Sequence, residues 1–233
     1  MTQTTLGKRT GTRKRRATSN LPATRTAVDT TLSVEERRVL VSDRPITFEQ
    51  WVDRGGRELY ELVNGSLVEM MAAHLEHERL FAWLFPLLGV YVGVRNQGEV
   101  LGSRTAVRIT EFGGRLPDIV FVRTDRADII KKRGIYSEPD LIIEILSPGD
   151  RPSDITALEA EYRTIGIPEL WFIDPKKRRV RVLTKGDVGY SETMVMDGTL
   201  ASSTVDGFAI DCEWLWADNR PDVLTLLRQM SDK

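Results

Sequence analysis

LPDIVFV at residues 116–122 and PDLIIEIL at residues 139–146 are the two stretches that decide the fold. Runs that are apolar on both faces are typical of central strands in a sheet covered on both sides. Each run nevertheless carries an acid, because Asp118 opens the first strand and Glu144 interrupts the second. A buried carboxylate needs a cation, a network of hydrogen bonds or a raised pKa. If the two strands are neighbours, Asp118 and Glu144 converge, and their oxygen atoms favour Mg²⁺ or Mn²⁺.

A structural explanation of the same two acids stays open at this point. Asp118 follows Pro117 and can simply cap its strand, and Glu144 can pair with a buried arginine such as Arg108. Acids with perturbed pKa values occur in structural ion pairs as well as in active sites. Asp140 shares the face of Glu144 by even spacing, but it stands where the strand begins and is expected to be solvated.

A β-hairpin is predicted upstream, where LYELV at residues 59–63 and SLVEM at residues 66–70 flank Asn64-Gly65. Asn-Gly accepts the positive φ angles of a type I′ turn. This two-residue turn places Glu61 opposite Val68, on a face that is otherwise apolar. Because an uncompensated carboxylate is costly on such a face, Glu61 is the third candidate acid.

The remaining pattern predicts an α/β or α+β fold, with a mixed central sheet flanked by a few helices. Thr47 and Gln50 have the spacing of a capping box, which predicts a short helix there. Helical spacing of apolar residues predicts helices at residues 77–92, which Pro86 is expected to kink or divide, and at residues 154–165. Further strands are expected at residues 99–101, 105–110, 170–173, 179–183 and 192–196.

Length and charge predict one domain preceded by a basic tail. The chain has 233 residues, of which 41% are hydrophobic, enough for one core. Residues 1–40 are rich in Thr, Arg and Ser and are expected to be a disordered basic tail, so that the domain spans residues 41–233. Residues 1–30 contain seven basic residues and one acidic residue, Asp29, so their net charge is +6. The remaining residues then carry a net charge of −7. Bulk charge therefore provides no argument for nucleic-acid binding by the domain.

Cysteine usage and targeting signals indicate the compartment. One cysteine, Cys212, excludes an internal disulfide and suits a reducing compartment. No apolar run reaches membrane-spanning length, and the first residues lack the apolar stretch of a secretory signal. We therefore expect a cytoplasmic protein without membrane contact. The basic run at residues 175–180 lies between two predicted strands and is expected to be a charged turn, not a nuclear address.

The order of these motifs resembles the PD-(D/E)XK nuclease superfamily, and in particular the Uma-two family of restriction-endonuclease-like proteins. The most specific blocks are EILSP at residues 144–148 and GIPELW at residues 166–171. The resemblance spans about residues 45–215, most of the predicted domain.

The resemblance implies a restriction-endonuclease-like core with a four-stranded mixed sheet and the acids at one end. By position, Asp118 and Glu144 are the implied metal-binding and catalytic acids, and Glu61 is the outlying catalytic acid. The implied activity is Mg²⁺- or Mn²⁺-dependent hydrolysis of phosphodiester bonds in DNA. Cleavage of both strands favours a homodimer, which supplies one active site per strand.

One departure from the superfamily concerns its lysine. That lysine normally stands two residues after the second acid, where this chain has Leu146, and the family's other position, four residues before Tyr162, is Leu158. A lysine there would help to orient the attacking water and offset developing charge. Arg151 and Arg163 are candidate substrate contacts, although a guanidinium is not interchangeable with an ammonium.

Three functions stay open from the sequence. The first is a DNA endonuclease, and the second is a catalytically weakened nuclease-fold protein that binds nucleic acid or a protein partner without cutting, as the two leucines favour. The third is a metal-stabilised scaffold, which the acidic body favours. His77 matches a family position and is a further candidate substrate contact, whereas His74 and His77 have too few companions for a zinc site.

Overall fold

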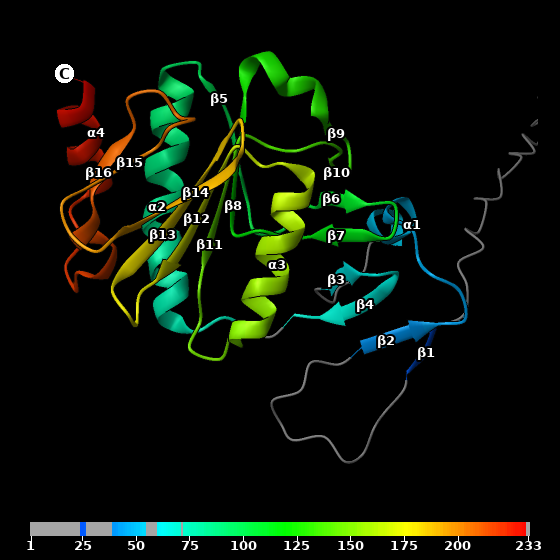
Figure 1. The fold of residues 1–233 in the computed structure, drawn as a ribbon. Helices are drawn as coiled ribbons and strands as arrows, with labels where there is room; N and C mark the ends of the chain where they lie inside the picture. Colours follow the sequence, from blue (N-terminus) through cyan, green and yellow to red (C-terminus); the bar gives the residue numbers. More distant parts are fainter. Residues whose placement is uncertain (1–23, 27–38, 55–59, 71, 232–233) are drawn as a thin grey trace, which may run out of the picture.

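The computed structural model describes residues 24–26, 39–54, 60–70 and 72–231. Its centre is a six-stranded mixed sheet with the order β14-β13-β12-β11-β8-β5 (Figure 1). Strands β11 and β12 run parallel, and the other neighbouring pairs run antiparallel. These strands are β5 (Gly98–Gly102), β8 (Ile119–Arg123), β11 (Leu141–Ile145), β12 (Glu169–Asp174), β13 (Arg179–Gly186) and β14 (Gly189–Val195). The predicted mixed α+β class is confirmed, and the two deciding stretches are neighbours at its centre.

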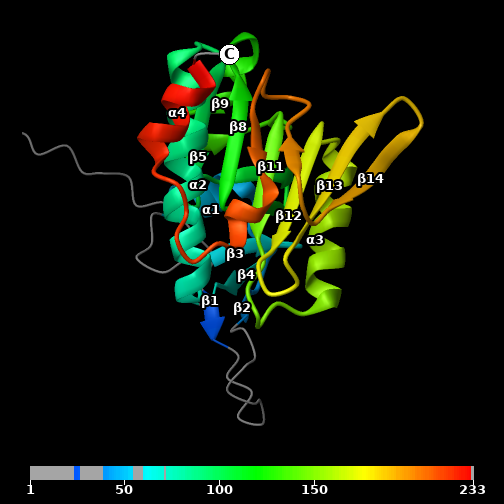
Figure 2. The ribbon, with the colours of Figure 1, turned by 90° about the vertical axis from the view of Figure 1, so that its left-hand side faces the viewer.

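Two helices cover the two faces of this sheet. Figures 1 and 2 show α2 (Leu75–Val94) on one side and α3 (Pro152–Ile165) on the other. Successive residues of β11 alternate between them, so that Ile143 packs in the cluster under α2 and Ile142 in the cluster under α3. The expected division of the first helix is wrong, since α2 continues through Pro86.

A second sheet lies beside the first and holds the early hairpin. Its eight strands have the order β1-β2-β4-β3-β7-β6-β10-β9. They are β1 (Thr24–Thr26), β2 (Val39–Ser42), β3 (Tyr60–Val63), β4 (Ser66–Glu69), β6 (Val107–Thr110), β7 (Gly113–Arg115), β9 (Ile130–Lys131) and β10 (Gly134–Ile135).

The local signals in this region are confirmed. Gln50 N donates to Thr47 Oγ1 at 3.2 Å and Thr47 N donates to Gln50 Oε1 at 3.0 Å, which is the capping box that starts α1 (Phe48–Arg54). Asn64 and Gly65 have φ angles of 49° and 77°, as a type I′ turn requires. Glu61 stands opposite Val68 in the resulting hairpin.

Strand β7 did not follow from the sequence. Gly113-Gly114 suggests a loop, yet β7 pairs with both β3 and β6. A Cβ atom on Gly114 would lie 2.3 Å from the ring of Trp51, so glycine is required for the close approach of α1. This approach brings Arg115, the last residue of β7, next to the hairpin acid.

The C-terminal part completes the cluster under α2. Trp214 and Trp216 pack against that cluster. The short elements outside the two large sheets are η1 (Thr124–Ile129), β15 (Thr199–Ala201), β16 (Ala209–Asp211), η2 (Cys212–Trp216) and α4 (Val223–Ser231). The basic run at residues 175–180 connects β12 and β13, which pair antiparallel, so it is the predicted charged turn.

Most of the tail expected at residues 1–40 lies outside the described residues. Its described part is β1 and the beginning of β2, which pair antiparallel. The domain boundary at residue 41 stays a prediction. Among the described helices, none is both long and apolar enough to cross a membrane.

Candidate active site

Asp118 and Glu144 lie side by side at one end of the central sheet. Strands β8 and β11 pair antiparallel with Ile119 opposite Ile143, and one further step in the same register places Asp118 opposite Glu144. Residues opposite each other share a face, and here it is the face covered by α3. The Ile145 N–H donates to Asp118 Oδ2 at 2.8 Å, which holds the first acid against the strand of the second.

Asp118 has a second partner, His77, from the first turn of α2. His77 Nε2 lies 3.0 Å from Asp118 Oδ2, and the two side chains are 10% and 15% exposed. Burial lowers the pKa of His77, but the hydrogen bond with Asp118 and the charges of Asp118 and Glu78 outweigh it, so the pKa is raised. Both contacts of Asp118 fall on Oδ2, which leaves Oδ1 to face a ligand. The sequence placed His77 in the cleft but did not predict its contact with Asp118.

Glu144 has a neutral partner in α3. The Tyr162 hydroxyl donates to Glu144 Oε1 at 2.6 Å. Burial of the carboxyl group and the nearby charge of Asp118 raise the pKa of Glu144 well above its usual value. Burial and the charge of Glu144 raise the pKa of Tyr162 in the same way. The alternative pairing with Arg108 is wrong, since Arg108 lies 3.5 Å from Glu49 instead.

Glu61 is compensated by a buried arginine. Arg115 Nη1 donates to Glu61 Oε2 at 2.7 Å, while Nε and Nη2 of the same guanidinium donate to the two carboxylate oxygens of Glu161, both at 2.7 Å. The Leu116 N–H also faces Glu61 at 3.4 Å. Burial lowers the pKa of Arg115, but its two carboxylate partners outweigh burial and raise it, so this guanidinium is a permanent charge.

The three acids therefore play two different parts. Glu61 has its own cation, whereas no basic side chain contacts Glu144 among the described residues. Within the same residues, no group of three or more His, Cys, Asp and Glu side chains is placed to hold a metal ion. The donor set is a pair, Asp118 and Glu144. Such a pair suits Mg²⁺, which keeps several waters and binds through one or two carboxylates, and a cation would favour the ionised form of Glu144.

The two positions expected for a lysine are apolar in the structure as well. Leu146 and Leu158 are partly buried and pack against the cluster under α3 that contains Tyr162. Neither position contributes a donor at the acids. The buried cation of this region is instead Arg115, on the strand that the sequence did not predict, and its only sequence signal is its place three residues before Asp118.

The candidate substrate arginines lie at opposite ends of α3. Arg151 is exposed and precedes the helix, where its carbonyl accepts from Asp154 N and Ile155 N. The Arg163 guanidinium contacts Glu159 at 3.2 Å and lies over the ring of Tyr190 at 5.0 Å, so its contacts are with neither acid.

Asp140 differs from expectation. It is 3% exposed, and its carboxylate accepts from Arg123 N at 2.9 Å and from Arg126 Nη1 at 3.0 Å. The expected solvation is therefore wrong, because the Arg123 N–H at the end of β8 and the Arg126 guanidinium of η1 provide these donors.

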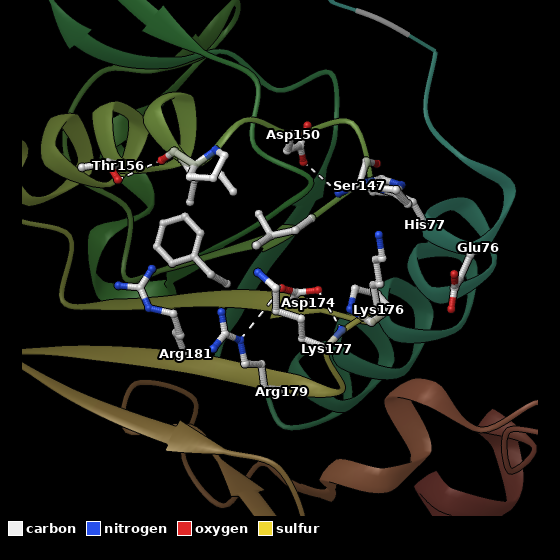
Figure 3. Close-up of a pocket in the computed structure, with 16 residues that line it drawn as sticks. Glu76, His77, Ser147, Asp150, Thr156, Asp174, Lys176, Lys177, Arg179 and Arg181 are labelled. Carbon is white, nitrogen blue, oxygen red and sulfur yellow. Dashed lines mark hydrogen bonds and ion pairs between the residues drawn. The ribbon is translucent and has the colours of Figure 1, made fainter.

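A pocket of about 300 Å³ opens next to the acids (Figure 3). His77 lines it and at the same time contacts Asp118, so the pocket and the acids share a wall. Leu146 and Phe172 supply apolar surface, and the β12–β13 turn supplies basic side chains. A ligand in this pocket would lie within reach of the acid pair.

Comparisons with known proteins agree with this geometry. A family model described as "Uma2: Putative restriction endonuclease" matches residues 46–214, close to the span of the motif resemblance. Among solved structures, the "putative nuclease belonging to DUF820 from Anabaena variabilis ATCC 29413" is similar, with a TM-score of 0.62 and 17% sequence identity over 74% of this chain and 98% of that chain. At this identity the likeness shows the fold alone. No curated protein matches the chain.

Proposed function

Because the chain belongs to the Uma2 family of the restriction-endonuclease-like superfamily, we propose that it is a metal-dependent endonuclease that hydrolyses phosphodiester bonds in DNA. The observation that carries the proposal is the pair of acids on neighbouring strands, of which Glu144 contacts no basic side chain among the described residues. A purely structural acid in this fold is compensated differently, as Glu61 and Arg115 demonstrate. A carboxyl group with a strongly raised pKa and no cationic partner, beside an open pocket, favours a ligand-binding role.

In this proposal Asp118 and Glu144 hold Mg²⁺ or Mn²⁺. When bound, the ion supplies Lewis acidity at the scissile phosphate and lowers the pKa of an attacking water. The protein's own residues prepare the acids for this. Tyr162 orients Glu144, the Ile145 N–H orients Asp118, and the proton on His77 Nε2 offsets part of the charge of Asp118.

The second candidate is a nuclease-fold protein that binds DNA or a protein partner without cutting. Leu146 and Leu158 favour it, because each fills a lysine position with packed apolar atoms. A missing ammonium removes a donor to developing charge, which is a large catalytic contribution. It does not remove the acid pair, so metal binding is common to both candidates.

The experiment combines calorimetry with a cleavage assay. Mn²⁺ should bind to wild type in isothermal titration, and Asp118→Ala and Glu144→Ala should abolish both binding and Mn²⁺-dependent nicking of supercoiled plasmid. Glu61→Ala should weaken binding less, because Arg115 already balances Glu61. The matched control is Asp125→Ala, whose side chain is 67% exposed beside Arg123.

The outcomes separate the candidates. Metal binding with nicking supports the endonuclease, and metal binding with no cleavage of DNA supports the binding protein. Equal Mn²⁺ affinity in wild type and all four variants would place the metal elsewhere and refute both.

Two finer points belong to the same proposal. Cleavage of both DNA strands calls for two active sites, so we propose a homodimer, which light scattering can test. The single cysteine supports a reducing compartment such as the cytoplasm.

A further inference from the structure

We propose that the pocket beside the acids binds a backbone phosphate of the DNA strand, next to the one that is cut, through the basic turn between β12 and β13. This inference rests on the proposed function and adds a substrate contact that the acid pair does not provide. It assigns a role to the basic run at residues 175–180, which lies between two strands and takes no part in the acid pair.

The pocket continues the acid pair along one end of the sheet. Glu144 stands opposite Phe172 on β12, and Phe172 stands opposite Arg181 on β13. Opposite residues share a face, so the acid, the apolar floor and the basic wall form one strip under α3. Asp174 and Arg179 extend this strip by one more pair toward the turn. Arg179 and Arg181 therefore lie on the same face of the sheet as Glu144, two strands away.

The basic side chains gather on one wall of the pocket. Figure 3 shows Lys176, Lys177 and Arg179 on the side of the turn, facing Ser147 and Asp150 across the pocket. The pocket as a whole is lined by four basic residues and three acidic ones, besides His77. These charged residues are Lys176, Lys177, Arg179, Arg181, Glu76, Asp150 and Asp174.

Most of these cations already have a partner within the protein. Asp174 lies 3.3 Å from Lys177 Nζ and 3.9 Å from Arg179 Nε. Arg181 is held by Glu159 at 2.8 Å and Glu192 at 2.9 Å. In the part of the chain that the structure describes, Lys176 contacts no acid.

The character of the wall fits a phosphate better than a base. Lys176 and Lys177 are exposed, and an ammonium on a flexible stem binds phosphate as a point charge without reading sequence. The aromatic ring in the lining, Phe172, is only 1% exposed and offers no stacking surface. The turn is therefore expected to strengthen binding equally for all DNA sequences.

The test compares two pairs of lysines by fluorescence anisotropy. The probe is a fluorescein-labelled DNA oligonucleotide, single-stranded or duplex, with EDTA present to prevent cleavage, over a series of KCl concentrations. Lys176→Glu/Lys177→Glu removes the proposed contact. The matched control is Lys131→Glu/Lys132→Glu, which makes the same charge change on exposed residues at and after β9. Figure 1 shows β9 at the other end of the molecule from the start of α3.

The expected result is specific to the turn. Each phosphate that the protein neutralises contributes about 0.9 to the magnitude of the slope of log K against log salt for duplex DNA. Losing the one proposed phosphate contact should therefore lower that magnitude by about 1 and weaken binding roughly tenfold near 0.1 M salt. The control should match wild type in slope and affinity. Both variants should keep the thermal midpoint of wild type, because all four lysines are exposed.

The failures of the two proposals are distinguishable. If wild type binds DNA and both lysine pairs behave alike, the turn is only a solvated hairpin and the nuclease proposal stands. If wild type neither binds nor cuts DNA, the proposed function fails and the phosphate site fails with it.

Discussion

Arg115 offers the sharpest test of the electrostatic arrangement. The change is Arg115→Met, which keeps an unbranched apolar side chain and removes the charge. The Arg115 side chain is 8% exposed and donates three hydrogen bonds of 2.7 Å, one to Glu61 and two to Glu161. Removing it leaves both carboxylates without their cation.

The size of the effect follows from the burial of the two carboxylates. Breaking a buried ion pair by removing one partner costs about 3–5 kcal/mol, because the other charge stays buried. Glu61 is 11% exposed and cannot recover water, whereas Glu161 is 30% exposed and can. The loss therefore comes mainly from Glu61, and we expect the free energy of unfolding to fall by about 3 kcal/mol. The double variant Glu61→Gln/Arg115→Met should lose less free energy of unfolding than the two single variants lose together, by about 1–3 kcal/mol.

The assay is urea denaturation at neutral pH with linear extrapolation to water. Arg133→Met is the matched control, since its side chain is 46% exposed and pairs with Asp53, which is 63% exposed. An exposed pair contributes about 0–1 kcal/mol, so this variant should stay near wild type. Equal losses in Arg115→Met and Arg133→Met, or a strictly additive cycle between Arg115 and Glu61, would refute the buried pairing.

Three further outcomes are expected. Leu158→Lys should raise Mn²⁺-dependent plasmid nicking above wild type and lower stability, because it places an ammonium inside an apolar cluster. Asp118→Ala in the Leu158→Lys background should abolish the gain in nicking. Cleavage unchanged by Leu158→Lys would mean that another group fills the role of the lysine. Glu169→Gln should cost about 1–3 kcal/mol in urea denaturation, since the fully buried Glu169 accepts five hydrogen bonds, four of them from residues 202–204, and an amide nitrogen accepts none. Burial raises the pKa of Cys212 to about 12. This thiol should therefore not react with a disulfide reagent near about pH 8 in the native protein, and it should react fully in urea. Rapid labelling of the native protein would contradict the burial of Cys212.

The features that the sequence predicted are local ones. The Asn64-Gly65 turn needs only two positive φ angles, and the capping box at Thr47 and Gln50 needs only one turn of helix. The strands of Asp118 and Glu144 were predictable because a long apolar run has few places other than a covered sheet. Their adjacency was a condition of the predicted acid pair, and the pairing of β8 with β11 meets it.

The features that the sequence did not predict depend on contacts between distant segments. His77 and Asp118 are separated by 41 positions, and no local pattern indicates that the start of a helix reaches the start of a strand. Asp140 was expected in solvent because it stands where its strand begins, but its partners Arg123 and Arg126 belong to β8 and η1. Arg115 follows Gly113 and Gly114, and a pair of glycines suggests a loop. In the structure, the missing side chain of Gly114 instead leaves room for the ring of Trp51.

Glu61 and Glu144 together show what separates a structural acid from a candidate ligand in this fold. Both were singled out by the same argument, that a carboxylate on an apolar face needs compensation. Glu61 receives it from Arg115, whose guanidinium stays charged, and so has no need of a ligand. Glu144 receives the hydroxyl of Tyr162 and a backbone hydrogen bond from Asp118 but contacts no cation among the described residues, and the charges of both Asp118 and Glu61 act against its ionisation. A divalent ion at Glu144 would favour its ionised form, which is why we propose the metal at Glu144 and Asp118 and not at all three acids.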